Sequence, residues 1–225
     1  MREQLYSLYE RIWHWLQAAM VWLLILTGAS IHAPDTLGVI PFGLAVRMHN
    51  ILGFLLLANA FLGVFYYVTT GIIRHYIPEP RDFVSLAVRQ ATHYVSGIFR
   101  GAPHPLEKTP HRRLNPLQQV TYLIILNVLL PLQIVTGTLM WGGQYWPQSV
   151  QFVGGLPALG MVHTLGAWLF GAFITMHVYL TTTGHTPLSN LRAMITGYEA
   201  APRVAGADHG RVATNGDSKS KGAQA

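Results

Sequence analysis

Two histidines interrupt an apolar segment, Val162 to Leu180, which reads VHTLGAWLFGAFITMHVYL. An imidazole is costly to place in hydrocarbon, and polar side chains at that depth usually serve a function. His163 and His177 are fourteen residues apart, which in an α-helix gives a rise of about 21 Å and leaves both rings within about 40° of one face. The two side chains therefore lie near opposite ends of one helix. They are too far apart to bind one metal ion together, so each needs a partner from another helix.

The elements that position these histidines are predicted to span a membrane. Of 225 residues, 51% are hydrophobic and only 11% are charged, whereas soluble domains carry about a quarter charged residues. We therefore predict an all-α fold, an integral membrane four-helix bundle. The first helix is expected to be retained in the mature protein, because it is longer than the apolar core of a signal peptide. Four apolar runs exceed the ~20 residues that cross a bilayer core: Ile12 to about His32, about Val46 to Ile73, Leu117 to Trp141, and Leu156 to Thr183.

The net charge of +6 sets the expected topology. Lysine and arginine gather before the first run, between the second and third, and after the fourth, while Arg47 alone lies on the other side. The positive-inside rule places the three basic segments, and both termini, in the cytoplasm. The basic charge is thereby explained without nucleic acid, and no nucleic-acid partner is predicted.

The connecting segments predict two further features. The polar stretch from about Arg74 to Pro116 contains DFVSLAVRQATHYVSGIFRG, in which apolar residues recur at helical spacing, so an amphipathic helix is expected in the inner interface between the second and third spanning helices. Pro131 predicts a kink in the third spanning helix. We expect residues 1–198 to form the membrane domain and residues 199–225, rich in Gly, Ala and Ser, to form a disordered cytoplasmic tail.

Two other histidines match the first two by depth. His14, in RIWHWLQ, lies near the inner end of the first helix, level with His177. His49, in VRMHNILG, lies near the outer start of the second helix, level with His163. Two layers of paired histidines suit two haems with bis-histidine ligation, in which no position on the iron remains for oxygen or substrate. The chain has no cysteine, so covalent c-type attachment is excluded and the haems would be b-type.

The other histidines are less suited to ligation. His32 is the rival to His49 in the outer layer, because its eighteen-residue spacing from His14 puts both on one face of the first helix; its position beside Ala33-Pro34-Asp35 favours an interfacial role. Five histidines beyond the inner helix ends or in the polar loop are expected to be solvated: His75, His93, His104, His111 and His185. A weak internal repeat is also visible, with LTG and VTG in helices one and three, and MHNILG and VHTLG in helices two and four.

These motifs resemble a known family. RIWHW in the first helix, a histidine early in the second and H-x13-H in the fourth are similar to the two-haem cytochrome b membrane subunits of nickel–iron hydrogenases, nitrate-inducible formate dehydrogenases and thiosulfate reductases. The resemblance covers about residues 5–195. It implies the pairing of His14 with His177 and of His49 with His163, and a place in the bacterial cytoplasmic membrane.

The resemblance also implies a function. The chain would be the electron-transfer subunit of a larger respiratory oxidoreductase, rather than an enzyme alone, carrying electrons between an outer-side (periplasmic) partner with iron–sulfur clusters or multiple haems and the quinone pool.

Asn115 and Gln118 match an Asn-x-x-Gln that borders the quinone pocket, although Asn115 before Pro116 is also explained as a helix cap. Arg11, and Arg112 or Arg113, are placed to contact inner haem propionates or serve only as positive-inside residues. The alternatives are a cofactor-free membrane anchor and a histidine proton relay, the latter disfavoured by the apolar helix between the layers.

Overall fold

Four long helices dominate the computed structural model, which describes residues 2–77, 83–102, 115–184 and 186–200. Within these residues, four helical spans are long and apolar enough to cross a membrane: Leu8–His32 (α1), Phe42–Thr69 (α3), Pro116–Gly142 (α5 to α6) and Gly155–Thr181 (α8). The predicted all-α membrane fold is confirmed. Helix α1 begins at Leu8, one turn before the predicted start, because Ser7 and Glu10 form a capping box in which Ser7 Oγ accepts from Glu10 N at 3.2 Å.

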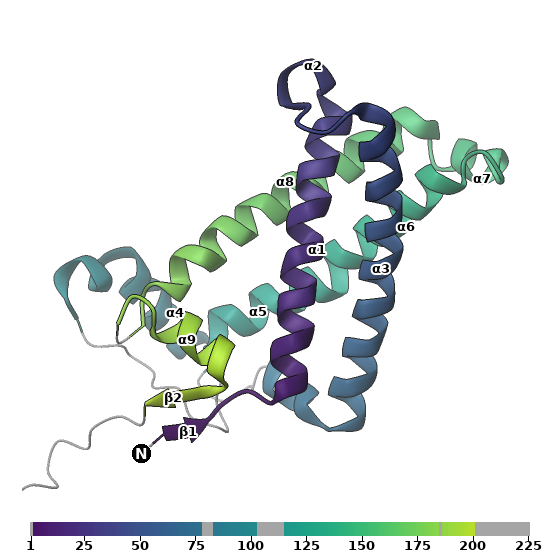
Figure 1. The fold of residues 1–225 in the computed structure, drawn as a ribbon. Coiled ribbons are helices and arrows are strands. Elements are labelled where there is room, and N and C mark those ends of the chain that lie inside the picture. Colours follow the sequence, from purple (N-terminus) through teal and green to yellow (C-terminus); the bar gives the residue numbers. More distant parts are fainter. Residues whose placement is uncertain (1, 78–82, 103–114, 185, 201–225) are drawn as a thin grey trace, which may run out of the picture.

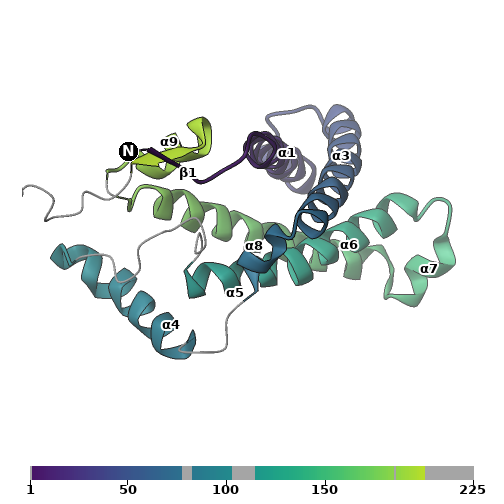
Figure 2. The same cartoon turned by 90° about the horizontal axis from the view of Figure 1, so that it is seen from below.

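The spans form two hairpins. Helices α1 and α3 are joined on one side by the short helix α2 (Pro34–Leu37), and α6 and α8 on the same side by α7 (Pro147–Phe152). Figure 1 shows the first hairpin running upright and the second crossing behind it obliquely, and Figure 2 shows α8 running beside α5 and α6. Helices α3 and α8, the second helices of the two hairpins, both begin at the end of the bundle where α2 and α7 lie. The charge distribution assigns this end to the outer side of the membrane.

Small residues allow close contact within each hairpin. The indole of Trp13 lies against Gly63, and its Nε1 donates to the backbone oxygen of Asn59 at 2.8 Å. In the second hairpin the side chain of Gln133 lies against Gly166. Because glycine has no side chain, a large group from the neighbouring helix reaches the backbone at both places.

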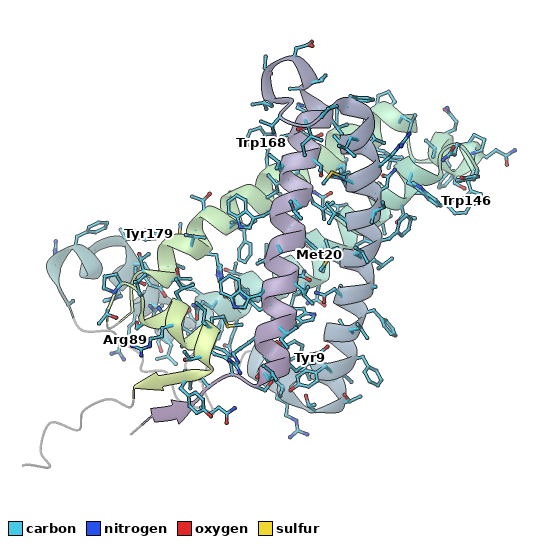
Figure 3. The ribbon with its side chains drawn as sticks, in the orientation of Figure 1. Tyr9, Met20, Arg89, Trp146, Trp168 and Tyr179 are labelled. Carbon is cyan, nitrogen blue, oxygen red and sulfur yellow. The ribbon has the colours of Figure 1, made fainter. Side chains whose placement is uncertain are left out.

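An apolar cluster fills the middle of the bundle. Met20 of α1, Leu56 of α3 and Leu130 of α6 are buried together, and Figure 3 labels Met20 half-way along α1. Partly buried apolar residues surround them: Val21, Leu24, Leu52, Ala60, Ile134 and Phe170. This cluster joins the two hairpins at a depth between the two pairs of histidines.

The third span is interrupted before Pro131. Helix α5 (Pro116–Ile124) passes into a π-helical turn, Ile125–Leu129 (η4), and then into α6 (Leu130–Gly142). Proline cannot donate a backbone hydrogen bond and its ring clashes with the carbonyl four residues earlier, so a wider turn relieves the conflict. The Nδ2 atom of Asn127 donates to the backbone oxygen of Leu123 at 2.9 Å, adding a polar contact in this turn. The predicted kink is thus a π-helical interruption.

The inner side carries the shorter elements. The predicted amphipathic helix is α4 (Phe83–Thr92), followed by the π-helical turn His93–Gly97 (η2) and the 3-10 turn Ile98–Arg100 (η3). It packs on α5 with Gln90 buried, and it leaves a second apolar face exposed toward the expected membrane interface: Val84, Val88, Val95 and Phe99. The other inner elements are a 3-10 helix, Ile72–Tyr76 (η1), and helix α9 (Ser189–Thr196).

Two sequence-based predictions need comment. His93 was expected to be solvated but is only 6% exposed, because its ring folds over Gly97, where no side chain obstructs it. Strand β2 (Tyr198–Ala200) pairs antiparallel with β1 (Arg2–Gln4), and the tail from residue 199 onward stays a prediction. The remaining residues of that tail, 201–225, lie outside the described residues.

The contact between Trp13 and Gly63 predicts a large effect of one methyl group. A Cβ at residue 63 would lie 2.5 Å from Trp13 Nε1, so Gly63→Ala must displace the indole and break its bond to Asn59. We expect a loss of about 1–3 kcal/mol of stability, as for other overpacked sites, seen as a lower thermal unfolding midpoint in detergent. The matched control is Gly43→Ala on the same helix, where a Cβ meets nothing within 4 Å. Equal midpoints for the two variants would contradict this packing argument.

Candidate haem sites

The outer histidines face one another across the two hairpins. His49 of α3 and His163 of α8 have ring centroids 6.1 Å apart and ring planes inclined by 71°. His32, the rival for this layer, is exposed at the end of α1, and no ring contact to either outer histidine is found for it among the described residues. The structure therefore brings His49 to His163.

The inner histidines form a second pair with the same separation. His14 of α1 and His177 of α8 have ring centroids 6.1 Å apart and planes inclined by 49°. Trp15 meets His14 edge-on at 5.2 Å, and Phe173 stacks on His177 at 5.7 Å. Each layer thus takes one histidine from α8 and one from the first hairpin, as the depth argument predicts.

The shared separation fits a metal between the rings. A metal–imidazole bond is about 2 Å long, taking zinc as the guide, and a ring centroid lies about 1 Å behind its nitrogen, so two trans imidazoles have centroids about 6 Å apart. Within the described residues, no group of three or more His, Asp or Glu side chains forms a metal site. A pair of histidines without further ligands suits a metal whose other four positions come from a porphyrin. On the two helices that carry the outer pair, a Cβ at Gly53, four residues after His49, or at Gly160, three residues before His163, would meet nothing within 4 Å.

Threonine hydroxyls hold the outer rings. Thr27 Oγ1 lies 2.9 Å from His49 Nδ1, and Thr136 Oγ1 lies 2.8 Å from His163 Nδ1. With Nδ1 engaged, the Nε2 atom of each ring remains for a metal. Sequence reasoning did not assign a role to either threonine, although the LTG and VTG repeat contains both.

The inner pair has a different environment. The Nδ1 atom of His14 is buried, and no hydrogen-bond partner is found for it within the part of the chain that the structure describes. Two ring contacts connect this pair with α5. Phe173 stacks on His177, and it meets Tyr122 of α5 edge-on at 6.2 Å. The inner pair is therefore connected by aromatic packing to the helix whose first turn carries the predicted quinone residues.

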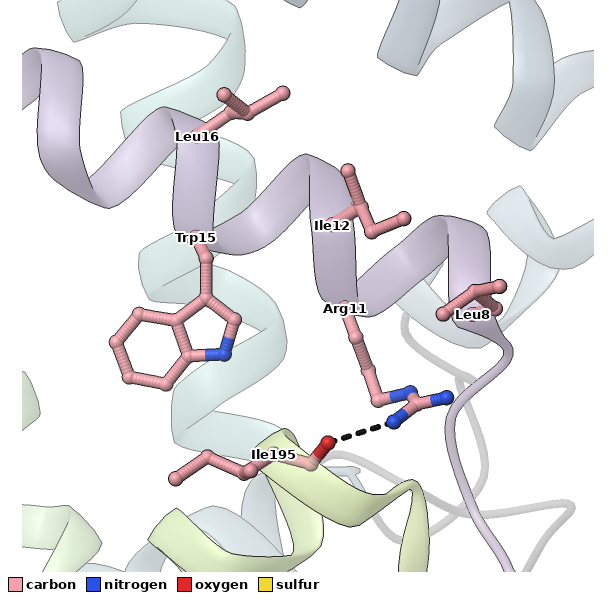
Figure 4. A pocket seen from close by; sticks show the side chains of 6 residues that line it. All are labelled: Leu8, Arg11, Ile12, Trp15, Leu16 and Ile195. Carbon is pink, nitrogen blue, oxygen red and sulfur yellow. Dashed lines mark hydrogen bonds between the residues drawn. The ribbon is translucent and has the colours of Figure 1, made fainter.

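Arg11 is engaged with the C-terminal part of the chain. Its guanidinium donates to the backbone oxygens of Ile195 at 2.6 Å and Ser7 at 3.4 Å. The first of these contacts satisfies a carbonyl at the end of α9, where a cation also suits the helix dipole. Figure 4 shows this bond at one side of an open groove of about 420 Å³. Propionate binding by Arg11 stays a prediction, and Arg112 and Arg113 lie outside the described residues.

Asn115 and Gln118 form the cap of α5. Asn115 Oδ1 accepts from Gln118 N at 2.9 Å, and Gln118 Oε1 accepts from Asn115 N at 3.1 Å, which completes a capping box. Asn115 Nδ2 in addition donates to the Tyr94 hydroxyl at 2.8 Å. Burial raises the pKa of Tyr94, whereas the amides of Asn115 and Gln90 act in the lowering direction. The cap is thus joined to the amphipathic segment, and a quinone role for the two residues stays a prediction.

Comparison with known proteins shows the family of the chain. Residues 5–197 match the family described as prokaryotic cytochrome b561. The chain belongs to the prokaryotic cytochrome b561 family. It is a b561-type membrane haem protein, and the family implies haem b.

Two named relatives cover most of this b561-family chain. It is 36% identical over 197 residues to the "Putative cytochrome YdhU" of Escherichia coli strain K12, covering 86% of this chain and 73% of that protein. It is 24% identical over 213 residues to the "Putative protein-methionine-sulfoxide reductase subunit YedZ1" of Azospira oryzae, covering 88% of this chain and all of that protein. The predicted membership of a cytochrome b family is confirmed.

The two pairs predict separate losses of haem. His163→Ala should remove the outer haem and His177→Ala the inner one, each leaving a single low-spin b-type spectrum, because each variant empties one axial position. His32→Ala serves as the control and should leave both haems in place, since His32 is exposed. Haem content per chain and reduced-minus-oxidised spectra measure the result. Two intact haems in both alanine variants would show that the pairs are not ligands.

Proposed function

We propose that this cytochrome b561-family chain holds two haems b and carries electrons across the membrane between an outer-side redox partner and quinone. The observation that supports the proposal most directly is the repeated 6.1 Å separation of His49 from His163 and of His14 from His177. Bound there, each haem would supply a one-electron redox centre with both axial positions taken by imidazole. Such a centre exchanges electrons and has no position for substrate.

The protein between the two layers is suited to electrons rather than protons. Met20, Leu56 and Leu130 fill the centre of the bundle, so the described structure has an apolar barrier where a histidine relay would need polar groups. This packing supports two separate redox sites and argues against the proton-relay alternative.

The inner end of the bundle offers groups that suit a quinone. Gln90 is 1% exposed, and its side-chain amide lies near enough to the Tyr94 hydroxyl to act on the pKa of Tyr94, but its polar atoms make no closer hydrogen bond among the described residues. A buried amide left unpaired costs about 1–3 kcal/mol, and a quinone carbonyl would accept from its NH₂ group. One turn further along lies Tyr94, whose hydroxyl already binds Asn115 and could supply a proton. These buried groups support the proposed quinone site at the α4–α5 contact.

An outer partner is proposed for the other haem. The name of the Azospira oryzae relative describes it as a subunit of a reductase, and a membrane cytochrome of that kind works with a separate catalytic protein. We place the partner, carrying iron–sulfur clusters or several haems, on the side of α2 and α7, where the outer histidine pair lies. The location would be the bacterial cytoplasmic membrane with both termini inside.

Haem counting tests the proposal directly. Purified chain should contain about two haems b, both low-spin and both reducible through added quinol. The cofactor-free anchor is the competing outcome, and it would show no b-type absorbance in chain that is folded and inserted. One haem per chain would also contradict the proposed arrangement.

Two substitutions at Asn115 separate capping from quinone binding. Serine keeps an N-cap oxygen for Gln118 N but cannot replace the amide that reaches Tyr94, whereas leucine removes both functions. If Asn115 serves the quinone, Asn115→Ser and Asn115→Leu should both slow quinol-dependent haem reduction severalfold with the haem spectra unchanged. If the residue only caps α5, Asn115→Ser should keep the wild-type rate while Asn115→Leu loses about 1 kcal/mol of stability.

A further inference from the structure

The same two-residue device occurs once in each hairpin. Thr27 and Gly28 on α1 contact His49 of α3, and Thr136 and Gly137 on α6 contact His163 of α8. In both hairpins the threonine comes from the first helix and the histidine from the second. Each outer histidine is therefore held by its own hairpin, before any contact with the other hairpin is needed.

The direction of the hydrogen bonds follows from the other bond that each threonine makes. Thr27 Oγ1 donates to the backbone oxygen of Leu23 at 2.8 Å, and Thr136 Oγ1 donates to that of Leu132 at 2.7 Å. A hydroxyl has one proton to donate. If that proton is given to the helix carbonyl, the oxygen accepts from the imidazole, and in that arrangement Nδ1 carries the ring proton and Nε2 keeps its lone pair.

The glycines and the burial make this arrangement rigid. A Cβ at Gly28 would lie 3.3 Å from His49 Cε1, and one at Gly137 would lie 3.2 Å from His163 Cε1, which leaves little space between each ring and the facing helix. Thr27 is 0% exposed and Thr136 is 5% exposed. Water therefore cannot compete for the imidazole proton, and the bond keeps its strength in a medium of low dielectric constant.

The inner pair lacks this device. His14 Nδ1 is buried without a hydrogen-bond partner, and the described structure offers His177 a stacked Phe173 rather than a hydroxyl. A hydrogen bond from the non-ligating nitrogen raises the basicity of an imidazole and strengthens its donation to a metal. Stronger donation stabilises the oxidised iron, so a ligand held in this way lowers a reduction potential.

We propose that Thr27 and Thr136 are positioning residues, which set the tautomer and orientation of both outer histidines and make the outer haem the one of lower reduction potential. The inference rests on the proposed two-haem function. It assigns a downhill order to the sites, with electrons passing from the outer haem to the inner one. Neither threonine touches the iron in this scheme, since each acts through its histidine.

The test compares valine and serine at each threonine. Valine has nearly the shape of threonine but cannot accept the imidazole proton, while serine keeps the hydroxyl. Thr27→Val and Thr136→Val should each raise the midpoint potential of the outer haem and change its low-spin EPR signal, with a larger shift in the double variant. Thr27→Ser and Thr136→Ser should restore values close to wild type. His163→Ala identifies which redox wave belongs to the outer haem.

Thr175→Val is the matched control. Thr175 lies on α8 between the two histidines and makes the same bond to a helix carbonyl, to Gly171 at 2.9 Å, but no hydrogen bond to a histidine is found for it among the described residues. It should leave both potentials unchanged. Selective loss of the outer haem in the valine variants, with the inner haem intact and rescue by serine, would also support the positioning role.

The outcome that overturns the inference differs from the one that overturns the proposed function. Wild-type chain that binds two haems, but whose outer potential and EPR signal are the same in Thr27→Val, Thr136→Val and Thr175→Val, would remove the role of the threonines alone. An outer haem of higher potential than the inner one would contradict the proposed order. Wild-type chain without haem would instead remove the function on which the inference rests.

Discussion

An imidazole inside a membrane has two nitrogens to satisfy, and this requirement governs the whole bundle. If one nitrogen binds iron, leaving the other without an acceptor in the protein is costly, since hydrocarbon has none; the outer layer avoids this cost and the inner layer does not. In the outer layer the acceptor is a threonine of the neighbouring helix, and the glycine that follows it leaves room for the close approach of the ring. The close pairing of α1 with α3 and of α6 with α8 is therefore tied to the chemistry of the two rings. The packing of these helices and the positions of the histidines form one arrangement.

The two hairpins share one arrangement of residues in the outer layer. His49 and His163 correspond in position, and so do the threonine and glycine that face each of them. Counting along the second helix of each hairpin, the residue of α3 that corresponds to His177 is Gly63. Trp13 lies against Gly63, so the place of a second histidine in the first hairpin is taken by an indole from α1. The inner pair uses His14 of α1 instead, which makes the outer layer symmetric and the inner layer asymmetric.

Most of the fold and the pairing of histidines could be read from the sequence, because depth in a membrane is a direct function of position along a helix. Apolar length fixed the four spans to within a turn, and the fourteen-residue spacing separated the two layers. The threonines were not assigned because an interhelical hydrogen bond depends on the rotation of two helices about their axes, which periodicity alone does not determine. Burial of His93 and the contact of Arg11 with Ile195 depend in the same way on short elements of the inner side, whose packing has no clear periodic signal. The repeat of LTG and VTG was visible, but only the positions of His49 and His163 give it a meaning.

The spacing along α8 also has an electrical consequence. Fourteen residues correspond to about 21 Å of helix, and the bilayer core is about 30 Å thick. A helix tilted against the membrane normal spans less of the bilayer than its length, so this length is an upper limit for the separation along the normal. An electron moved between the two sites thus crosses at most about two thirds of the transmembrane voltage, which corresponds to at most about 1.6 kcal/mol per 100 mV. In a cell whose interior is negative, inward transfer is opposed by this amount, so a potential difference between the sites of at most about 70 mV is needed to offset each 100 mV across the membrane. The length of one helix therefore sets how strongly the membrane voltage can oppose the electron flow that the chain supports.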